Sequence, residues 1–502
     1  MIGYIKKTIA KIWAKNHVKK SYQHKQNAAE DQEKLLLELV NKANKTLFGR
    51  ERNFESIQSI QDFQRQVPIS DYEDLRPYIE RIKKGQAHIL YPDTPTYFAK
   101  TSGTTSGAKY IPLTSEGMDD QVKAAQSALF HYIAQKNNAD FVNGKMIFLQ
   151  GSPALEDLFG IKVGRLSGIV AHHIPQYLQK NRLPSWETNT IEDWETKLDA
   201  IIQETEHENM TLISGIPPWL IMYFEKLRDK HGKSIKEIFP RLQIIVTGGV
   251  NYEPYREKMN ELLGKPVDVI QTFPASEGFF AFQDDCTQEG LQLLTHHGIF
   301  YEFVPLEEIG KENPRRYTLS EIELYKDYAL IITTNSGLWA YSIGDVVQFI
   351  SKNPYRILVT GRTKHFTSAF GEHVIGHEAE TSMKNTLKAF PEVMVREYHL
   401  APQVNPNEGL PYHEWLIEFD TAPENVLAFE EQLDAEMCAK NIYYKDLREG
   451  NILRRLKITI LKSNSFIDFA KSTGKLGGQN KLPRLANDRS IANELEKFKL
   501  NH

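Results

Sequence analysis

Short runs of β-prone residues alternate with helical segments between about residues 140 and 275. Residues 192–204 are one such segment, with apolar residues at helical spacing. Neighbouring parallel strands need a long connection between them, which is usually a helix. We therefore expect an α/β fold class, with parallel or mixed sheets in a large N-terminal domain. The β-prone runs begin at Met146, Thr211, Ile244 and Val267.

Closely spaced strands replace this alternation between residues 298 and 361, which predicts a small antiparallel or barrel subdomain. The chain after residue 361 mixes helical and β-prone segments and has the size of a separate small α+β domain. We therefore expect a large domain over residues 1–361, a hinge at 362–366 and a small, mobile C-terminal domain over 367–502. In that last domain we expect helices near 378–389 and 424–440 and strands near 393–400, 415–419 and 457–461.

The composition excludes several classes of function. The 61 Lys and Arg residues nearly balance the 65 Asp and Glu residues, so we expect no nucleic-acid partner. Cys286 and Cys438 lie far apart without metal-ligand spacing, which is typical of a reducing compartment such as the cytoplasm. No apolar run reaches the roughly 18 residues that span a bilayer, so we expect no stable membrane insertion. The sequence does not indicate an oligomeric state.

The first 29 residues contain seven lysines and no acidic residue. Ile5, Ile9, Ile12 and Trp13 recur at helical spacing, which predicts a basic amphipathic helix. Such a helix either contacts a membrane surface or packs on its own domain with the lysines outward.

A segment rich in hydroxyl groups and glycine, TSGTTSGAK, lies between β-prone flanks at residues 101–109. Glycine lets backbone N–H groups approach oxyanions closely, while hydroxyls and a lysine supply further donors and positive charge. The spacing differs from a Walker loop, because one extra residue precedes the lysine and Tyr110 follows it. A flexible linker is the alternative, but its flanks would not be β-prone. We expect phosphate binding by Ser102, Gly103, Thr104, Thr105, Ser106, Gly107 and Lys109.

This segment resembles the phosphate loop of the adenylate-forming enzymes, and further motifs follow in the order of that superfamily. They are TGG at 247–249, TFPASEG at 272–278, YSIGDVV at 341–347 and GRTKHF at 361–366. Over nearly its full length the chain resembles the auxin-responsive Gretchen Hagen family of acyl acid amido synthetases, specifically its bacterial members. The stretches YEFVP at 301–305, SGLWAYSIGDVVQF at 336–349 and GGQNKLPR at 477–484 carry this narrower resemblance. TFPASEG departs from the usual pattern, with Phe273 as the aromatic residue and Pro274 in place of a glycine.

The resemblance implies roles for individual residues toward ATP and magnesium. The loop hydroxyls hold the β and γ phosphates, Glu277 binds Mg²⁺, and Asp345 accepts hydrogen bonds from the ribose. Gly248 and Gly249 leave room for adenine. The remaining ATP-binding residues are Thr272, Phe273, Ser276 and Arg362. The catalytic residues are Glu277, Lys364 at the hinge, and Lys481. Lys475 is the alternative to Lys481, and Glu277 or Asp345 taken alone could be an ordinary turn residue.

The function implied is ligation in two steps. ATP and a carboxylic acid give an acyl-adenylate and pyrophosphate, and the amine of an amino acid then displaces AMP to form an amide. An acyl-CoA-forming ligase and a non-catalytic nucleotide-binding relative are the alternatives. The pairs His172–His173 and His296–His297 lack accompanying carboxylates, and adjacent residues of a strand face opposite sides, so we expect no structural zinc. Neither cysteine has a neighbouring activating group, so we expect no covalent cysteine catalysis.

Overall fold

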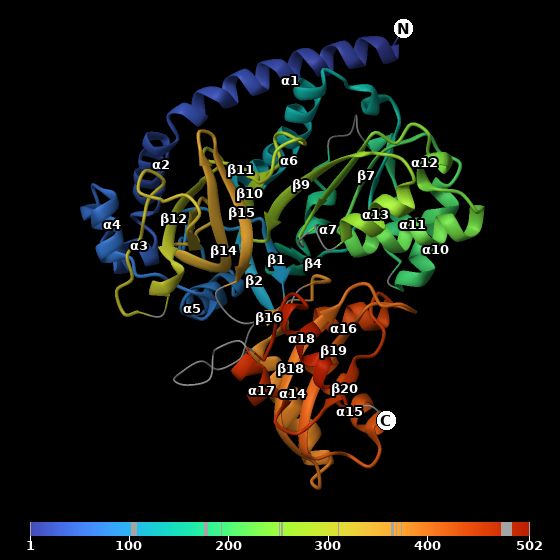
Figure 1. The fold of residues 1–502 in the computed structure, drawn as a ribbon. Helices are drawn as coiled ribbons and strands as arrows, with labels where there is room; N and C mark the ends of the chain where they lie inside the picture. Colours follow the sequence, from blue (N-terminus) through green and yellow to red (C-terminus); the bar gives the residue numbers. More distant parts are fainter. Residues whose placement is uncertain are drawn as a thin grey trace.

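An eleven-stranded sheet forms the centre of the N-terminal part of the chain in the computed structural model (Figure 1). The structure describes residues 2–101, 108–174, 179–191, 193–249, 252, 255–309, 311–362, 366–367, 369–372, 374–472 and 484–500. The strand order is β12-β13-β14-β15-β11-β10-β9-β8-β7-β3-β6.

The last five strands in this order are parallel, which confirms the predicted parallel sheet. Apolar residues of the helices that connect these strands and of the strands themselves, such as Leu198, Phe224 and Ile245, form one buried core. The strands are β3 (Lys145–Phe148), β6 (Arg182–Leu183), β7 (Met210–Ser214), β8 (Ile244–Gly248) and β9 (Asp268–Ala275). The helices are α10 (Trp194–Thr205), α11 (Pro217–His231), α12 (Ile235–Ile238) and α13 (Arg256–Leu263).

The other six strands are antiparallel, as predicted for residues 298–361. They do not form a separate sheet or barrel, because β9 turns back into β10 and hydrogen-bonds to it, so that the ladder continues without a break. Five of the six are hydrogen-bonded on both sides within this sheet. They are β10 (Gly278–Phe282), β11 (Leu291–Leu293), β12 (Ile299–Pro305), β13 (Asp327–Thr334), β14 (Tyr341–Lys352) and β15 (Tyr355–Arg362).

A second sheet of four strands carries the hydroxyl-rich segment. Its order is β2-β1-β5-β4, and β1 and β2 form an antiparallel hairpin. Its strands are β1 (Tyr97–Thr101), β2 (Lys109–Leu113), β4 (Glu156–Leu158) and β5 (Ile161–Gly164). Helix α5 (Tyr72–Lys83) contacts β2, and α7 (Leu166–Ala171) contacts β1. Helix α2 (Ala28–Ala43) contacts β12 of the large sheet and the short helices α3 (Leu47–Glu51) and α4 (Ile60–Gln66).

The long N-terminal helix α1 (Ile2–Gln26) lies along the edge of the large domain that is farthest from the C-terminal domain (Figure 1). It packs on α6 (Ser115–Lys136) and contributes Ala14 to a core shared with that helix. No helix in the described part of the chain is long and apolar enough to cross a membrane.

The C-terminal part contains its own cores around a three-stranded sheet. The two cores lie on opposite faces of the sheet, because alternate residues of its middle strand point to opposite sides. Trp415 and Ile417 face one core, and Leu416 faces the other. Trp219 and Met222 of α11 pack against the first of these cores and so join the two domains. The sheet has β18 (Met394–Gln403), β19 (Tyr412–Thr421) and β20 (Lys457–Leu461), covered by α14 (Gly376–Ala389), α15 (Val426–Lys440), α16 (Ile442–Glu449), α17 (Ser465–Ser472) and α18 (Ser490–Leu495). A two-stranded ribbon, β16 (Phe366–Thr367) and β17 (Val374–Ile375), precedes them.

Candidate active site

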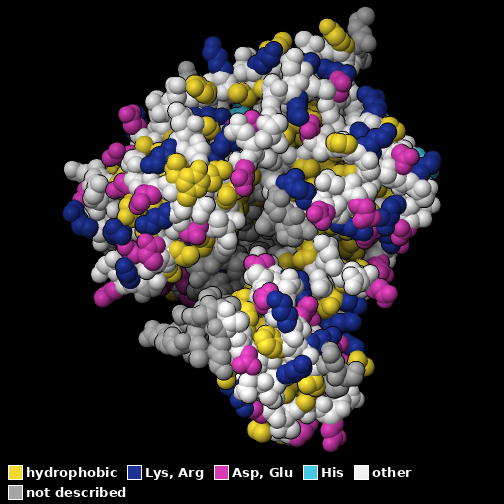
Figure 2. Space-filling view, viewed as in Figure 1, with side chains coloured by type: hydrophobic (Ala, Val, Ile, Leu, Met, Phe, Trp, Pro, Cys, Tyr) yellow, Lys and Arg dark blue, Asp and Glu magenta, His cyan; other side chains and the backbone are white. Residues whose placement is uncertain are grey.

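A cleft of about 2960 Å³ lies between the two domains. Figure 2 shows it as a hollow between the large body and the smaller lower domain. Ordinary small-molecule pockets measure roughly 300–1,000 Å³. The cleft therefore has room for a nucleotide together with further substrates.

The carboxyl ends of the parallel strands open into this cleft. Gly151 follows β3, Ile216 follows β7, Gly249 follows β8, and Thr272 lies near the end of β9. Ligands of open α/β sheets bind outside the carboxyl ends of the strands. The sheet thus presents its usual ligand-binding edge to the C-terminal domain.

The hydroxyl-rich segment is attached at the rim of the cleft. Thr101 ends β1 and is paired with Lys109 at the start of β2, and both residues line the cleft. The Lys109 Nζ lies 5.7 Å from the centroid of the Tyr72 ring. The hairpin therefore brings both ends of the segment to the cavity. Its central residues Ser102, Gly103, Thr104, Thr105, Ser106 and Gly107 lie outside the described residues.

Ser276 and Glu277 form the two-residue turn between β9 and β10, and both line the cleft. Glycine after the turn permits close packing, because a Cβ on Gly278 would lie 2.4 Å from Ile299 Cδ1. The turn is thus held tightly against the core below it.

Phe273 also lines the cleft, and its ring packs edge-on against Phe280 with 5.1 Å between centroids. One side of this aromatic residue is therefore held by the core and the other faces the cavity. Thr272 Oγ1 donates a hydrogen bond to Thr247 O at 3.0 Å, which joins β9 to β8.

The two glycines at the end of β8 differ in their surroundings. A Cβ on Gly248 would lie 2.4 Å from Thr272 Oγ1, so the adjacent strand fills the space beside it. Gly248 thus permits close packing of β8 on β9, and its expected place beside adenine stays a prediction. Gly249 has φ +80° and lines the cleft, and its expected place beside adenine likewise stays a prediction.

Asp345 lies half-buried on β14 and lines the same cleft as Glu277. Gly344 before it has φ +86°, a backbone conformation that favours glycine. The backbone of Asp345 is paired with that of Arg362 on β15, and the ladder is irregular at the next residue. The Arg362 side chain, Lys364, Lys475 and Lys481 lie outside the described part of the structure.

Two cationic residues that sequence reasoning missed also line the cleft. Lys197 is 2% exposed, and its Nζ donates hydrogen bonds to Gln150 O at 3.0 Å and Asn189 O at 2.8 Å. Burial, helped by the nearby charge of Arg165, lowers the pKa of Lys197 to about 8. Two positively charged side chains, Lys197 and Arg165, therefore line this part of the cleft. A lone lysine in a helix gives no sequence signal for such a position.

The C-terminal domain closes this side of the cleft through α16. The Tyr443 hydroxyl donates a hydrogen bond to Lys100 O at 3.0 Å, next to the hydroxyl-rich segment. Asp446 forms an ion pair with Arg165, whose guanidinium carbon lies 5.2 Å from the Tyr443 ring centroid. These contacts join residues more than 270 positions apart, so no local pattern could have indicated them.

The histidine pairs and the cysteines have other surroundings. His296 and His297 lie in a turn with 4.2 Å between ring centroids, so the expected placement on opposite sides of a strand is wrong for this pair. His172 and His173 follow α7, and their Nε2 atoms make hydrogen bonds with Pro153 O and the Tyr97 hydroxyl. Burial raises the pKa of both Cys286 and Cys438 to about 11, which disfavours the reactive thiolate.

Comparison with known proteins finds three models of one family along the chain. The GH3 family N-terminal domain matches residues 17–197, the central domain matches residues 292–362, and the C-terminal domain matches residues 377–490. Among curated relatives from Arabidopsis thaliana, indole-3-acetic acid-amido synthetase GH3.3 is 23% identical over 90% of this chain and 88% of its own length. Indole-3-acetic acid-amido synthetase GH3.2 is 31% identical over 63% of this chain and 70% of its own length.

A solved structure of AtGH3.15 acyl acid amido synthetase in complex with 2,4-DB shares the fold. The alignment has a TM-score of 0.61 and 16% sequence identity, and it covers 97% of this chain and 96% of that one. The family models follow one another in the same order as the large domain, its antiparallel strands and the C-terminal domain. This chain belongs to the GH3 family of adenylate-forming acyl acid amido synthetases.

Proposed function

We propose that the chain activates a carboxylic acid with ATP and transfers the acyl group to the amine of an amino acid. One observation supports this most directly: the two ends of the hydroxyl-rich segment, Glu277 and Asp345 all line the same interdomain cleft. Separate surfaces for these elements would be incompatible with a single nucleotide site.

In the first step a carboxylate oxygen of the acid attacks the α-phosphorus of ATP, and pyrophosphate leaves. The hydroxyls and N–H groups of residues 102–107 bind the β and γ phosphates, and Asp345 accepts hydrogen bonds from the ribose. The nucleotide base is positioned beside Phe273, Gly248 and Gly249. We assign further contacts with the nucleotide to Thr272, Ser276, Lys109 and Arg362.

Glu277 is the carboxylate that we assign to magnesium. Among the described residues no group of three or more His, Cys, Asp or Glu is arranged to hold a metal ion. Such a site still fits magnesium, because this ion commonly binds one or two carboxylates together with substrate phosphates and waters. When bound, magnesium supplies positive charge that offsets the charge of the phosphates.

In the second step the amine nitrogen attacks the acyl carbonyl carbon, and AMP leaves with the electrons of the broken C–O bond. We propose that Arg165 and Lys197 attract the carboxylate of the incoming amino acid, because these two cations line the cleft where the domains meet. We assign catalytic roles to Lys364 in the hinge at 362–366 and to Lys481 in the mobile domain at 367–502, with charge stabilisation during adenylation as the role of Lys481.

Carboxylate-dependent exchange of labelled pyrophosphate into ATP tests the first step across a library of acids. Mass spectrometry with an amino acid pool, and separately with coenzyme A, tests the second. An amide and AMP are expected. A CoA thioester would contradict the amide proposal, and the absence of exchange with every acid would favour a nucleotide-binding protein without turnover. The relatives named above are plant proteins, so the bacterial origin, like the cytoplasmic location, stays a prediction.

A further inference from the structure

Helix α1 exposes apolar side chains on the face that points away from the protein. Ile5, Ile9 and Ile12 are 49%, 43% and 53% exposed, and Trp13 is 59% exposed. Residues spaced by three and four positions share one side of a helix. These four residues therefore form one outward stripe, which we call the α1 stripe.

The opposite face holds α1 in place along its length. Lys7 Nζ lies 2.5 Å from Asp140 Oδ1, and the His17 Nε2 makes a 2.8 Å hydrogen bond with the Ser127 hydroxyl. Ala14 between them is fully buried. The helix is therefore packed on the domain by its small and polar residues. The α1 stripe is exposed to solvent, because the core between α1 and α6 contains Ala14 and none of the four stripe residues.

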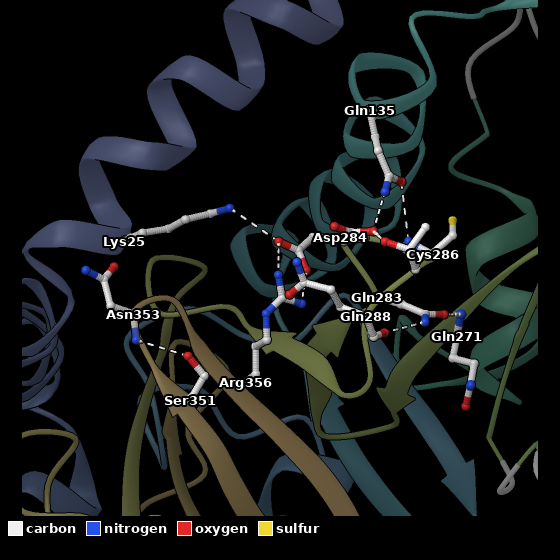
Figure 3. Close-up of polar contacts among 12 residues, drawn as sticks. Lys25, Gln135, Gln271, Gln283, Asp284, Cys286, Gln288, Ser351, Asn353 and Arg356 are labelled. Carbon is white, nitrogen blue, oxygen red and sulfur yellow. Dashed lines mark hydrogen bonds and ion pairs between the residues drawn. The ribbon is translucent and has the colours of Figure 1, made fainter.

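An ion-pair network fixes the C-terminal end of the helix. Lys25 Nζ lies 3.6 Å from Asp284 Oδ2, and Arg356 of β15 donates a hydrogen bond to the same oxygen at 3.1 Å (Figure 3). The three side chains are nearly buried, since Lys25 is 11% exposed and the other two are less so. The direction of α1 is thus set by the central sheet.

The charge on α1 has one sign. It carries seven lysines and no acidic residue, although the whole chain has a net charge of −4. The exposed lysines Lys6, Lys15, Lys19 and Lys20 flank the α1 stripe. Long lysine side chains can lie along an apolar surface and extend their ammonium groups into a polar layer. Basic and hydrophobic side chains are both visible along this edge in Figure 2.

We propose that α1 docks the protein peripherally on an anionic lipid membrane. An apolar stripe containing Trp, flanked by lysines, matches the interfacial layer of such a membrane in both polarity and charge. A second copy of the chain is a poorer partner, because two helices with only positive charges repel each other. The helix lies on the side away from the C-terminal domain, so docking leaves the interdomain cleft accessible (Figure 1).

Vesicle flotation of the full-length protein tests the proposal. The protein is expected to float with phosphatidylcholine–phosphatidylserine vesicles, to bind pure phosphatidylcholine far more weakly, and to dissociate as salt rises. Replacing Ile5, Ile9, Ile12 and Trp13 by Ser should weaken binding about a hundredfold, since each loses an apolar contact with the membrane. Lys15→Gln with Lys19→Gln should weaken it about 25-fold, at about fivefold per lysine.

Leu427→Ser combined with Met394→Ser provides the matched control, because these exposed apolar residues lie on the C-terminal domain. The control should bind vesicles like the wild type, and all variants should keep the wild-type melting temperature and pyrophosphate exchange. Failure of the wild type to bind anionic vesicles would overturn the proposal. So would equal binding by the serine variant, or a wild-type dimer that the serine variant converts to a monomer. None of these outcomes depends on the proposed enzymatic function.

Discussion

Asp345→Asn should weaken ATP binding in a way that depends on the ribose hydroxyls. The carboxylate can accept from two vicinal hydroxyls, and hydrogen bonds to charged groups contribute about 1.5–3 kcal/mol each. Asp345 is half-buried, so the lower end of this range applies. Asparagine keeps one acceptor oxygen and loses the charge. The expected cost is about 1.5–2 kcal/mol, or about 10–30-fold in the KM for ATP.

The assay is acid-dependent pyrophosphate exchange, measured with ATP and with 2′,3′-dideoxy-ATP. Wild-type enzyme should discriminate strongly between the two nucleotides, and the Asn variant should discriminate by less than about threefold. Changing the carboxylate and the ribose hydroxyls separately and together forms a thermodynamic cycle, which isolates the interaction between these two groups. Asp327→Asn is the matched control. Asp327 lies on β13 and is paired with Gln348 of β14, the strand that carries Asp345. It accepts a hydrogen bond from Thr360 Oγ1 at 2.9 Å and does not line the cleft.

An equal loss of affinity for both nucleotides in the Asn variant would refute the assignment of Asp345 to the ribose. A lower melting temperature together with unchanged KM in the surviving enzyme would also refute it, because it would indicate a purely structural carboxylate. The Asp327 control should leave the KM for ATP within about twofold of the wild type, as expected for a residue outside the site.

Three further predictions concern the charged groups of the cleft. Glu277→Gln should raise the magnesium concentration needed for half-maximal exchange and slow adenylation by about 10²–10³-fold, and a normal magnesium titration would contradict its role. Lys481→Ala should slow adenylation by about one to three orders of magnitude with little change in ATP affinity, while equal losses in both would indicate simple binding. Lys197→Met should raise the KM for the amino acid about tenfold, and in the wild type the same KM should rise with pH through about 8 as the ammonium group deprotonates. Because the pKa of Lys197 is lower in the folded than in the unfolded chain, wild-type stability should increase with pH above about 8, and the Met variant should lack this increase in urea unfolding.

The parallel sheet could be predicted from sequence because each strand and helix has its own local period. The continuity of the sheet could not be. The pattern changes near residue 298, yet the antiparallel half begins at β10, directly after the two-residue turn at Ser276 and Glu277. A tight turn between a half-buried strand and a buried one gives only a weak local signal, because the packing of Gly278 against Ile299 depends on residues distant in sequence.

The candidate site shows a similar division. Glu277 and Asp345 could be proposed as ligands because each lies in a motif of recognisable residue types, and both line the cleft. Lys197 could not, since an isolated lysine in a helix is ordinary until the fold buries it. The stripe on α1 was expected as an apolar face, but its direction depends on which face packs on α6, and that face is the one with Ala14.

The contacts that close the cleft suggest how one site can serve two chemical steps. The Arg165–Asp446 pair is 40% and 34% exposed, so solvent screening limits its contribution to at most about 1 kcal/mol. The hydrogen bond from Tyr443 to Lys100 O adds about 0.5–1.5 kcal/mol. These two polar contacts hold the orientation of the domains only weakly, and the apolar packing of Trp219 and Met222 adds to them at the same junction. Inter-domain surfaces within a chain generally permit relative motion. In the proposed reaction the amine must reach the acyl-adenylate after pyrophosphate has left, and separation of the weak α16 contacts would supply that change of access.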